Sequence, residues 1–330
     1  MECEAFAPAS LVTKGSPLSA VAIRSRLVLE IASELVGGTD RSIRVAEVRL
    51  RDLASEPALR LSSLSTIGAV FDVVERRVDL AIANPSAALT LAYRGTGPFS
   101  RSLPVRTIAV IPSADQYVFA VKKEIGLTCF EDIGAKRAPL RVLLRGVPDH
   151  FLHVMLDDIA AAAGFAVSDI AAWGGTLHKT GPHPLPGDEK FAAVAGGEAD
   201  ALFDEGAAGW VGAAVESGMT ILPLGEETLR KLEGIGYRRA LLRKEIYPQL
   251  PTDVATVDFS GWPIFVREDL PDGRVTQICA ALQSRRDRIV WQGPGPLPLE
   301  RMCRDVPDAP MGVPLHPAAE RFWRQCGYLR

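Results

Sequence analysis

The stretch RRVDLAIANPSAALTLAYRG, residues 76–95, has the order of a single strand–turn–helix unit. Asp79 precedes four apolar residues, Leu80–Ala83, which predict a short buried strand. The polar turn Asn84-Pro85-Ser86 then begins an Ala-rich helix, and proline suits a first helical turn because its missing N–H would have no partner there. Successive units of this kind predict a parallel sheet covered by helices, an α/β fold.

The same order recurs in GGEADALFDEGAAGWVGAAVESG, residues 196–218. Asp200 stands where Asp79 stands in the first unit, and it again precedes an apolar strand, a polar turn and an Ala-rich helix. The two units are about 120 residues apart, far beyond the period of a solenoid repeat. The repetition predicts two similar lobes, and a chance likeness between two α/β units is the alternative.

Other elements fit between and around these units. Apolar residues at four-residue spacing, Leu27, Ile31 and Leu35, predict an amphipathic helix over residues 20–36. Further segments with the pattern of a strand or a helix are a strand over 43–50, a helix from a Ser65 or Thr66 cap to Arg77, a strand over 140–146 and a helix over 149–163.

Two extended segments, residues 116–122 and 252–266, have the character of connections between lobes. If the chain crosses at both, the second lobe is inserted in the first, and a ligand cleft lies between them. We therefore expect lobe 1 in residues 1–117, lobe 2 in 118–255, and a return to lobe 1 with a wrapping tail in 256–330.

Composition narrows the class of function. The 330 residues carry a net charge of −3 with 7% aromatic residues, which argues against a nucleic-acid partner because phosphate contacts need a basic surface. No apolar stretch is long enough to predict membrane insertion. The first 25 residues lack a secretory signal, so a cytoplasmic location is expected, or a periplasmic one if the N-terminus has been truncated or replaced. The five dispersed cysteines indicate reduced thiols.

Polar turns at the carboxyl ends of the predicted strands are the candidate ligand site, because ligands bind at that edge of an open α/β sheet. Arg145 is suited to hold a carboxylate with both arms of its guanidinium. Ser and Thr at a helix start are alternatively plain caps. The candidate ligand-binding residues in these turns are Ser65, Thr66, Asn84, Ser86, Arg145 and Gly146.

Aromatic and titratable residues give further candidates. Tyr117 and Trp262, on the proposed connections, predict either an apolar wall of the cleft or packing at the hinge. Asp204 and Glu205 are adjacent and would point to opposite faces of a strand, which weakens a paired-carboxylate role. His150 and His153 share a helix face and would approach a metal only if a third ligand were present, so no metal is expected. No nucleotide or other cofactor motif occurs in a strand–helix context, so no cofactor is expected.

Three stretches carry a resemblance to a known family: residues 76–99, residues 246–272 with IYPQLPTDVATVDFSGWPIFVREDLPD, and residues 313–329 with VPLHPAAERFWRQCGYL. The chain resembles the TAXI group of solute-binding proteins of TRAP transporters, which have the type II periplasmic-binding-protein fold. The resemblance covers roughly residues 60–330. It implies two lobes that close by a hinge over a small, often anionic ligand, and membrane transporter subunits as partners.

The resemblance also bears on single positions. It places Ser65 and Thr66 at a ligand-facing helix start, Asn84 and Ser86 in a strand-end turn, and Arg145 with Gly146 in the equivalent turn of lobe 2. The sequence departs from the group at VTKGSPLSA, residues 12–20, which stands in for an opening strand and glycine-rich turn.

Two functions fit these observations. The first is binding of a small carboxylate-containing solute by closure of two lobes. The alternative is a cytoplasmic lyase or decarboxylase that acts on a small carboxylate in the same cleft, with His150, Asp204 and Glu205 as acid and base.

Overall fold

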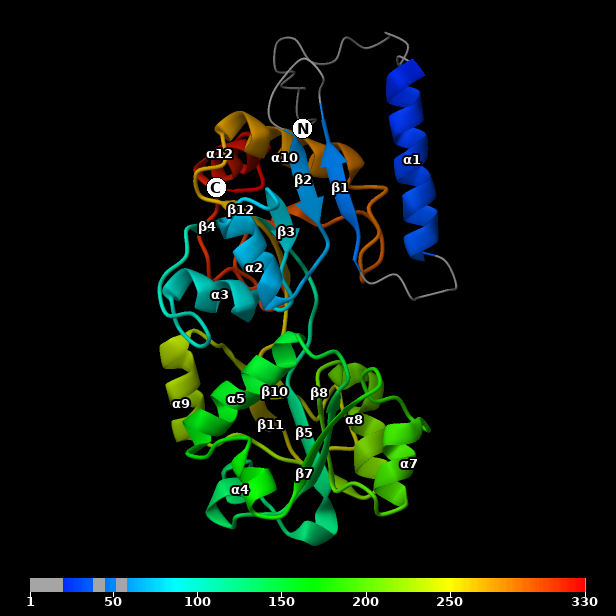
Figure 1. The fold of residues 1–330 in the computed structure, drawn as a ribbon, viewed down its shortest axis with the longest axis vertical. Coiled ribbons are helices and arrows are strands. Elements are labelled where there is room, and N and C mark those ends of the chain that lie inside the picture. The colour runs from blue at the N-terminus through cyan, green and yellow to red at the C-terminus, as the bar shows by residue number, and fades with distance from the viewer. Residues whose placement is uncertain (1–19, 38–44, 52–57, 330) are drawn as a thin grey trace.

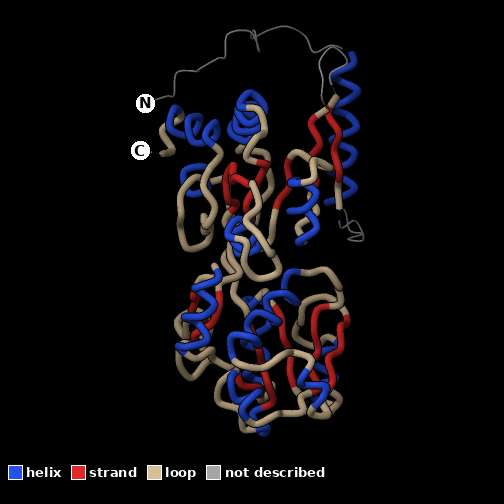
Figure 2. The backbone as a smooth tube through the Cα atoms, turned by 60° about the vertical axis from the view of Figure 1, so that its left-hand side comes forward, coloured by secondary structure: helices blue, strands red, loops and turns tan. Residues whose placement is uncertain are grey.

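The structure is a computed structural model that describes residues 20–37, 45–51 and 58–329. Figure 1 shows two bodies stacked along the long axis, and Figure 2 shows the same bodies with strands inside and helices outside. Cys3, nearly all of the first 25 residues and the start of the strand expected over 43–50 lie outside the described residues. The described part of the chain contains no helix that is long and apolar enough to cross a membrane.

The helix expected near the N-terminus is present as α1, Ala20–Gly37. Its apolar face has no covering partner among the described residues, because Leu27, Ile31 and Leu35 are 58%, 52% and 59% exposed. The periodicity therefore predicted the helix correctly, but the helix does not pack on the core (Figure 1).

Lobe 1 is built on a five-stranded sheet with the order β1-β2-β3-β12-β4. The strands are β1 (Glu47–Leu50), β2 (Leu59–Ser62), β3 (Leu80–Ile82), β12 (Trp262–Arg267) and β4 (Val105–Ile111). The helices of this lobe are α2 (Ile67–Val74), α3 (Ser86–Arg94), α10 (Asp272–Arg285), α11 (Leu299–Met302) and α12 (Pro317–Gln325). One apolar cluster joins the strands to α10, α11 and α12, with Trp323 fully buried in it.

Lobe 2 is built on a second five-stranded sheet with the order β7-β6-β8-β5-β9. The strands are β7 (Thr176–Thr180), β6 (Arg141–Arg145), β8 (Ala201–Asp204), β5 (Val118–Lys122) and β9 (Met219–Ile221), and a separate two-stranded ladder pairs β10 (Arg239–Leu242) with β11 (Val254–Val257). The helices of this lobe are η1 (Lys123–Ile125, a 3₁₀ turn), α4 (Glu131–Ala135), α5 (Phe151–Ala163), α6 (Asp169–Ala172), α7 (Glu189–Ala195), α8 (Ala207–Glu216) and α9 (Glu226–Ile235).

The two repeated units of the sequence occupy equivalent places in the two lobes. β3 lies between a parallel neighbour, β2, and an antiparallel one, β12, while β8 lies between parallel β6 and antiparallel β5. The aspartate before each strand has the same function. Asp79 accepts a hydrogen bond from the Arg60 backbone N–H at 2.8 Å, and Asp200 accepts one from the Arg141 backbone N–H at 2.9 Å. The repetition thus marks two lobes of common design.

The chain crosses between the sheets twice, through residues 112–117 and 258–261, and these crossings run side by side. The Tyr117 N–H donates to the Val257 carbonyl at 3.1 Å, and the Gly261 N–H donates to the Ser113 carbonyl at 2.9 Å. Gly261 has φ +78°, a backbone conformation that glycine adopts without strain. The inserted second lobe and the shared strand order confirm the two-lobed type II arrangement that the resemblance implied.

Candidate functional site

Arg145, at the end of β6, is held by carboxylates of its own chain. Its Nε lies 3.1 Å from both carboxylate oxygens of Asp204, and its Nη2 lies 3.0 Å from Glu205 Oε1. The Asp204 side chain is fully buried, and that of Arg145 is 12% exposed. We expected this guanidinium to hold a ligand carboxylate. In the structure, its arms already have carboxylate partners.

Strand alternation predicted that Asp204 and Glu205 point to opposite faces. In the structure they do not. β8 ends at Asp204, so Glu205 belongs to the following turn and no longer obeys the strand alternation. Both side chains reach the same Nη2 of Arg145. The reason for the difference is that strand alternation applies only within a strand, whereas Glu205 lies in the turn that follows it.

Glu205 is the most perturbed carboxyl group of this cluster. Burial raises its pKa to about 8, and the negative charge of Asp115 adds to the effect while Arg145 opposes it. At neutral pH, therefore, Glu205 carries its proton.

His150 faces Glu205 from the start of α5. Its Nδ1 accepts a capping hydrogen bond from the Leu152 N–H at 3.3 Å, and its ring stacks on Phe259 with the centroids 6.3 Å apart. Its Nε2 lies 3.6 Å from Glu205 Oε1. Burial lowers the pKa of His150 to about 4, with the charge of Arg145 as the second cause, so the ring is neutral at physiological pH.

The histidine pair does not form a metal centre. His153 Nε2 lies 2.9 Å from the Val147 carbonyl, while His150 caps the helix. Within the described ranges, no group of three His, Cys, Asp or Glu side chains is placed to hold a metal ion.

Two residues of this edge were not among the sequence candidates. The Asp115 carboxylate, from the first crossing, accepts from the Gly206 N–H at 2.9 Å and the Ala207 N–H at 3.2 Å, so it occupies the start of α8. Lys190 of α7 is 4% exposed and its Nζ lies 3.7 Å from Asp204 Oδ2. Asp115 had one signal in the sequence, a charged residue in a connecting segment, whereas Lys190 had none because its burial depends on packing.

The corresponding edge of the lobe 1 sheet, where its strands end, is different, because several of its polar side chains have no hydrogen-bond partner among the described residues. Thr66 is the N-cap residue of α2, yet its side chain makes no capping hydrogen bond. Among the described residues, neither Asn84 Oδ1 nor Ser86 Oγ has a hydrogen-bond partner, although both atoms are buried. Ser65, which directly precedes Thr66 in the sequence, is half-buried. These candidates keep groups that a ligand can satisfy.

The remaining candidates serve packing in this structure. Tyr117 is 1% exposed and its ring lies 4.6 Å from that of Phe203 in the core of lobe 2, while its buried hydroxyl has no hydrogen-bond partner among the described residues. Trp262 is half-buried and pairs with Ile111 at the start of β12. The Gly146 N–H donates to the Gly181 carbonyl at 2.8 Å, which joins it to a neighbouring loop.

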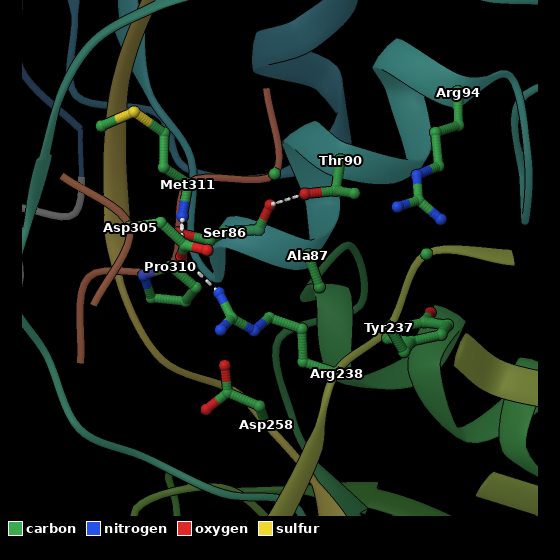
Figure 3. A pocket seen from close by; sticks show the side chains of 12 residues that line it. Ser86, Ala87, Thr90, Arg94, Tyr237, Arg238, Asp258, Asp305, Pro310 and Met311 are labelled. Atoms are coloured by element: carbon green, nitrogen blue, oxygen red, sulfur yellow. Dashed lines mark hydrogen bonds and ion pairs between the residues drawn. The ribbon is translucent and has the colours of Figure 1, made fainter. Parts of the chain in front are cut away.

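A pocket of about 350 Å³ lies between the lobes, beside α3 (Figure 3). Lobe 1 contributes Ser86, Thr90 and Arg94 from α3, and residues 236–238 line it from lobe 2. The other residues of the lining are Ala87, Asp258, Asp305, Pro310, Met311 and Gly312. Its volume falls within the range of small-molecule sites, about 300–1,000 Å³.

Charged groups of both signs line this pocket. Arg238 donates to Asp305 at 2.5 Å, whereas the guanidinium of Arg94 forms no hydrogen bond or ion pair with the residues that the structure describes (Figure 3). Asp258 is near the hinge, and burial raises its pKa to about 6. Arg94 was not among the sequence candidates. Its position at the end of a helix gives no sign of a pocket that is formed only together with residues of the other lobe.

Solved structures that resemble the chain are distant in sequence. The alkanesulfonate-binding protein SsuA from Xanthomonas axonopodis pv. citri, bound to MOPS, is 14% identical, with 79% of this chain and 71% of that chain covered and a TM-score of 0.31. A periplasmic transporter is 14% identical over 81% of each chain, with a TM-score of 0.36. An ATP phosphoribosyl transferase complex from Thermotoga maritima is 11% identical over 81% of this chain and 94% of that chain, with a TM-score of 0.36.

Sequence identities and TM-scores this low do not identify a ligand. Comparison with curated proteins gives no match. A family model, in contrast, matches residues 37–327, which is nearly the whole of the described chain. On this match the chain belongs to the NMT1-like family.

Proposed function

We propose that this chain is a solute-binding protein that holds a small carboxylate-containing molecule between its lobes. The observation that carries the proposal is the pocket of about 350 Å³ that both lobes line, with the guanidinium of Arg94, which has no partner in the described part of the chain, on one side. A planar guanidinium is suited to bind a carboxylate through two parallel hydrogen bonds.

The buried polar atoms of lobe 1 add to this argument. Ser86 is one of the residues that line the same pocket, and its buried Oγ has no hydrogen-bond partner among the described residues; neither has Asn84 Oδ1, two residues earlier. Buried polar groups are satisfied in nearly all proteins, so a hydroxyl and an amide left without partners favour a ligand that supplies them. A carboxylate on Arg94 with a polar substituent near Ser86 satisfies both ends.

The transport role is the finer part of the proposal. We propose that the chain is a TAXI-type receptor that delivers its solute to TRAP-transporter membrane subunits, on the basis of the sequence resemblance. Such a receptor acts outside the cytoplasm, where it meets the transporter. Co-purification of a membrane subunit with the tagged chain supports this role, and solute-independent behaviour in a transport assay opposes it.

Binding is tested by calorimetry with a panel of small mono- and dicarboxylates. Replacement Arg94→Gln removes the positive charge and should lower the affinity for the best ligand by at least tenfold, or about 1.4 kcal/mol. The matched control is Arg288→Gln, which changes an exposed arginine outside the pocket and should leave the affinity unchanged. Equal affinities of the Arg94 variant and the wild type place the ligand elsewhere.

A second function is favoured by one specific observation. His150 Nε2 and Glu205 Oε1 are 3.6 Å apart, and at neutral pH the carboxyl group of Glu205 is able to donate a proton, while the neutral imidazole, whose Nδ1 accepts from the Leu152 N–H, presents its Nε2–H toward it. A carboxylic acid and an imidazole so placed are groups that a lyase or decarboxylase uses for proton transfer. Product analysis of the same carboxylate panel tests it: turnover that Glu205→Gln abolishes establishes an enzyme, and unchanged ligands after long incubation exclude this chemistry for the panel.

A further inference from the structure

A second hollow lies in lobe 2, and its lining shares no residue with the interlobe pocket. It measures about 800 Å³ and is bounded by β6, β7 and the start of α7. We call it the α7 groove, and its lining consists of Arg141, Leu143, Thr176, Leu177, His178, Thr180, Gly181, Pro182, Leu185, Asp188, Glu189, Lys190, Ala193 and Glu198.

Part of the α7 groove is aliphatic. Leu143 comes from β6 and Ala193 from α7, and both pack in the apolar cluster on the α7 side of the sheet, whereas Leu177 pairs with Val142 and its side chain faces the other side. Leu185 adds a side chain that is 44% exposed. Apolar surface of this kind, next to a few polar groups, is typical of a small-molecule site.

Lys190 is the polar group that distinguishes the α7 groove. Its side chain is 4% exposed, and its Nζ makes no hydrogen bond with any described residue. An ammonium group has three N–H donors, and lysine is almost never buried without partners. Asp204 Oδ2, 3.7 Å away, is an ion-pair partner of Lys190 but lies outside hydrogen-bonding distance. An acceptor that belongs to a ligand would satisfy this group.

The charges around Lys190 favour an anion. Arg145 and Lys190 both approach Asp204, and Arg145 has the closer contact. The other carboxyl group on Arg145 is Glu205, whose pKa is raised to about 8, so it adds no negative charge at neutral pH. Two cations thus share the carboxylate of Asp204.

The rim of the α7 groove limits the charge that a ligand can carry. Asp188 is engaged by the Leu185 N–H at 2.8 Å and the Phe191 N–H at 3.0 Å. Glu189 and Glu198 are further acidic residues of the lining. A second negative charge on the ligand would meet these carboxylates, so the rim disfavours a dianion.

We propose that the α7 groove is a second ligand site, which binds a small aliphatic monocarboxylate with its carboxylate on Lys190 Nζ and its chain on Leu143 and Leu185. The loop over residues 181–187 lies against the lysine, since a Cβ atom at Gly181 would be 3.9 Å from Lys190 Cε. Gly181 and Gly187, at the two ends of this loop, have φ +57° and +81°, conformations that glycine adopts without strain, and contact of a ligand with the buried Nζ requires the loop to move.

The probe is octanoate, titrated into the full chain by calorimetry at neutral pH. We expect saturable binding that Lys190→Met weakens by at least tenfold, because methionine keeps the aliphatic stem and removes the ammonium group. The octanoate binding that depends on Lys190 should be unchanged in Arg94→Gln, in the interlobe pocket, so failure of this proposal and failure of the solute-binding proposal are distinguishable.

A second variant covers the case in which Lys190→Met does not fold. Leu185→Ser changes an exposed side chain of the groove and should weaken octanoate severalfold while leaving the shorter butyrate unaffected. Absence of saturable octanoate binding to the wild type overturns the proposal. Loss of binding in Arg94→Gln, with retention in Lys190→Met or Leu185→Ser, overturns it as well, because the ligand then occupies the interlobe pocket.

Discussion

At the end of β8 in lobe 2, Arg145 contacts Asp204 and Glu205, whereas at the end of β3 in lobe 1 the polar atoms of Asn84 and Ser86 have no partners among the described residues. The two strands hold equivalent places in their sheets. The charged groups at this edge of lobe 2 are engaged with one another, although four buried atoms of lobe 2 also lack hydrogen-bond partners among the described residues: Tyr117 OH, Glu131 Oε2, His153 Nδ1 and Lys190 Nζ. We propose that recognition of a solute between the lobes depends mainly on side chains of lobe 1.

The helix starts repeat this contrast. In lobe 2, Asp115 occupies the start of α8 and the side chain of Asp188 caps α7. In lobe 1, neither α2 nor α3 has a side-chain cap. Free N–H groups at a helix start attract anions, so the contrast points to lobe 1 as the side on which an anionic group binds.

The largest effect should come from breaking the ionic cluster of lobe 2. Asp204→Asn leaves the guanidinium of Arg145 and the ammonium of Lys190 without their shared buried carboxylate, and we expect a loss of about 3 kcal/mol in the free energy of unfolding. Ser86→Ala at the edge of lobe 1 removes a hydroxyl that has no partner, so its loss should stay within about 0.5 kcal/mol. Urea unfolding of both variants measures the difference, and similar losses would contradict the contrast between the lobes.

An intermediate effect should appear in the dependence of stability on pH. The pKa of Glu205 is about 8 in the folded chain against an ordinary value of 4.5, so the folded state retains a proton that the unfolded state loses. The stability that the protonated Glu205 side chain contributes is therefore present at low pH and is lost as the pH rises toward about 8.

Above pH 6.5, the titration of Glu205 is separated from the titrations of its neighbours His150 and Asp258. The pKa of His150 falls from 6.5 to about 4, so its contribution is lost as the pH falls below 6.5, and that of Asp258 is raised only to about 6. We expect Glu205→Gln to flatten the decline in stability between pH 6.5 and about 8, measured by denaturant unfolding. A variant that declines as steeply as the wild type would refute a buried, protonated Glu205.

The smallest effect should come from the helix starts. Asp188→Ala removes a cap that accepts from the Phe191 N–H, and we expect a loss of about 1 kcal/mol. Thr66→Ala removes a hydroxyl that makes no capping bond, and its effect on thermal stability should be too small to separate from zero. A loss of about 1 kcal/mol for the threonine variant as well would show that α2 is capped in solution.

Local patterns in the sequence were enough to predict most elements of the fold. The Leu80–Ala83 run and its counterpart before Asp204 appear as β3 and β8, because a run of three or four apolar residues between a charged residue and a polar turn suits a buried strand. The helix starting at Ser86 is also confirmed. Predictions that rested on side-chain direction were less secure, as Glu205 shows, since they require the last residue of a strand to be known.

The sequence by itself determined the repeated strand–turn–helix units, the two lobes and the polar turns at their edges, because each depends on neighbours within a few residues. Tertiary structure alone decided which of those turns is free. β6 and β8 pair with Leu143 opposite Leu202, so two residues later Arg145 comes level with Asp204 and the two form an ion pair. That register is set by the packing of whole strands, and no pattern within either strand reveals that the charge of Arg145 is already neutralised by a residue 59 positions away.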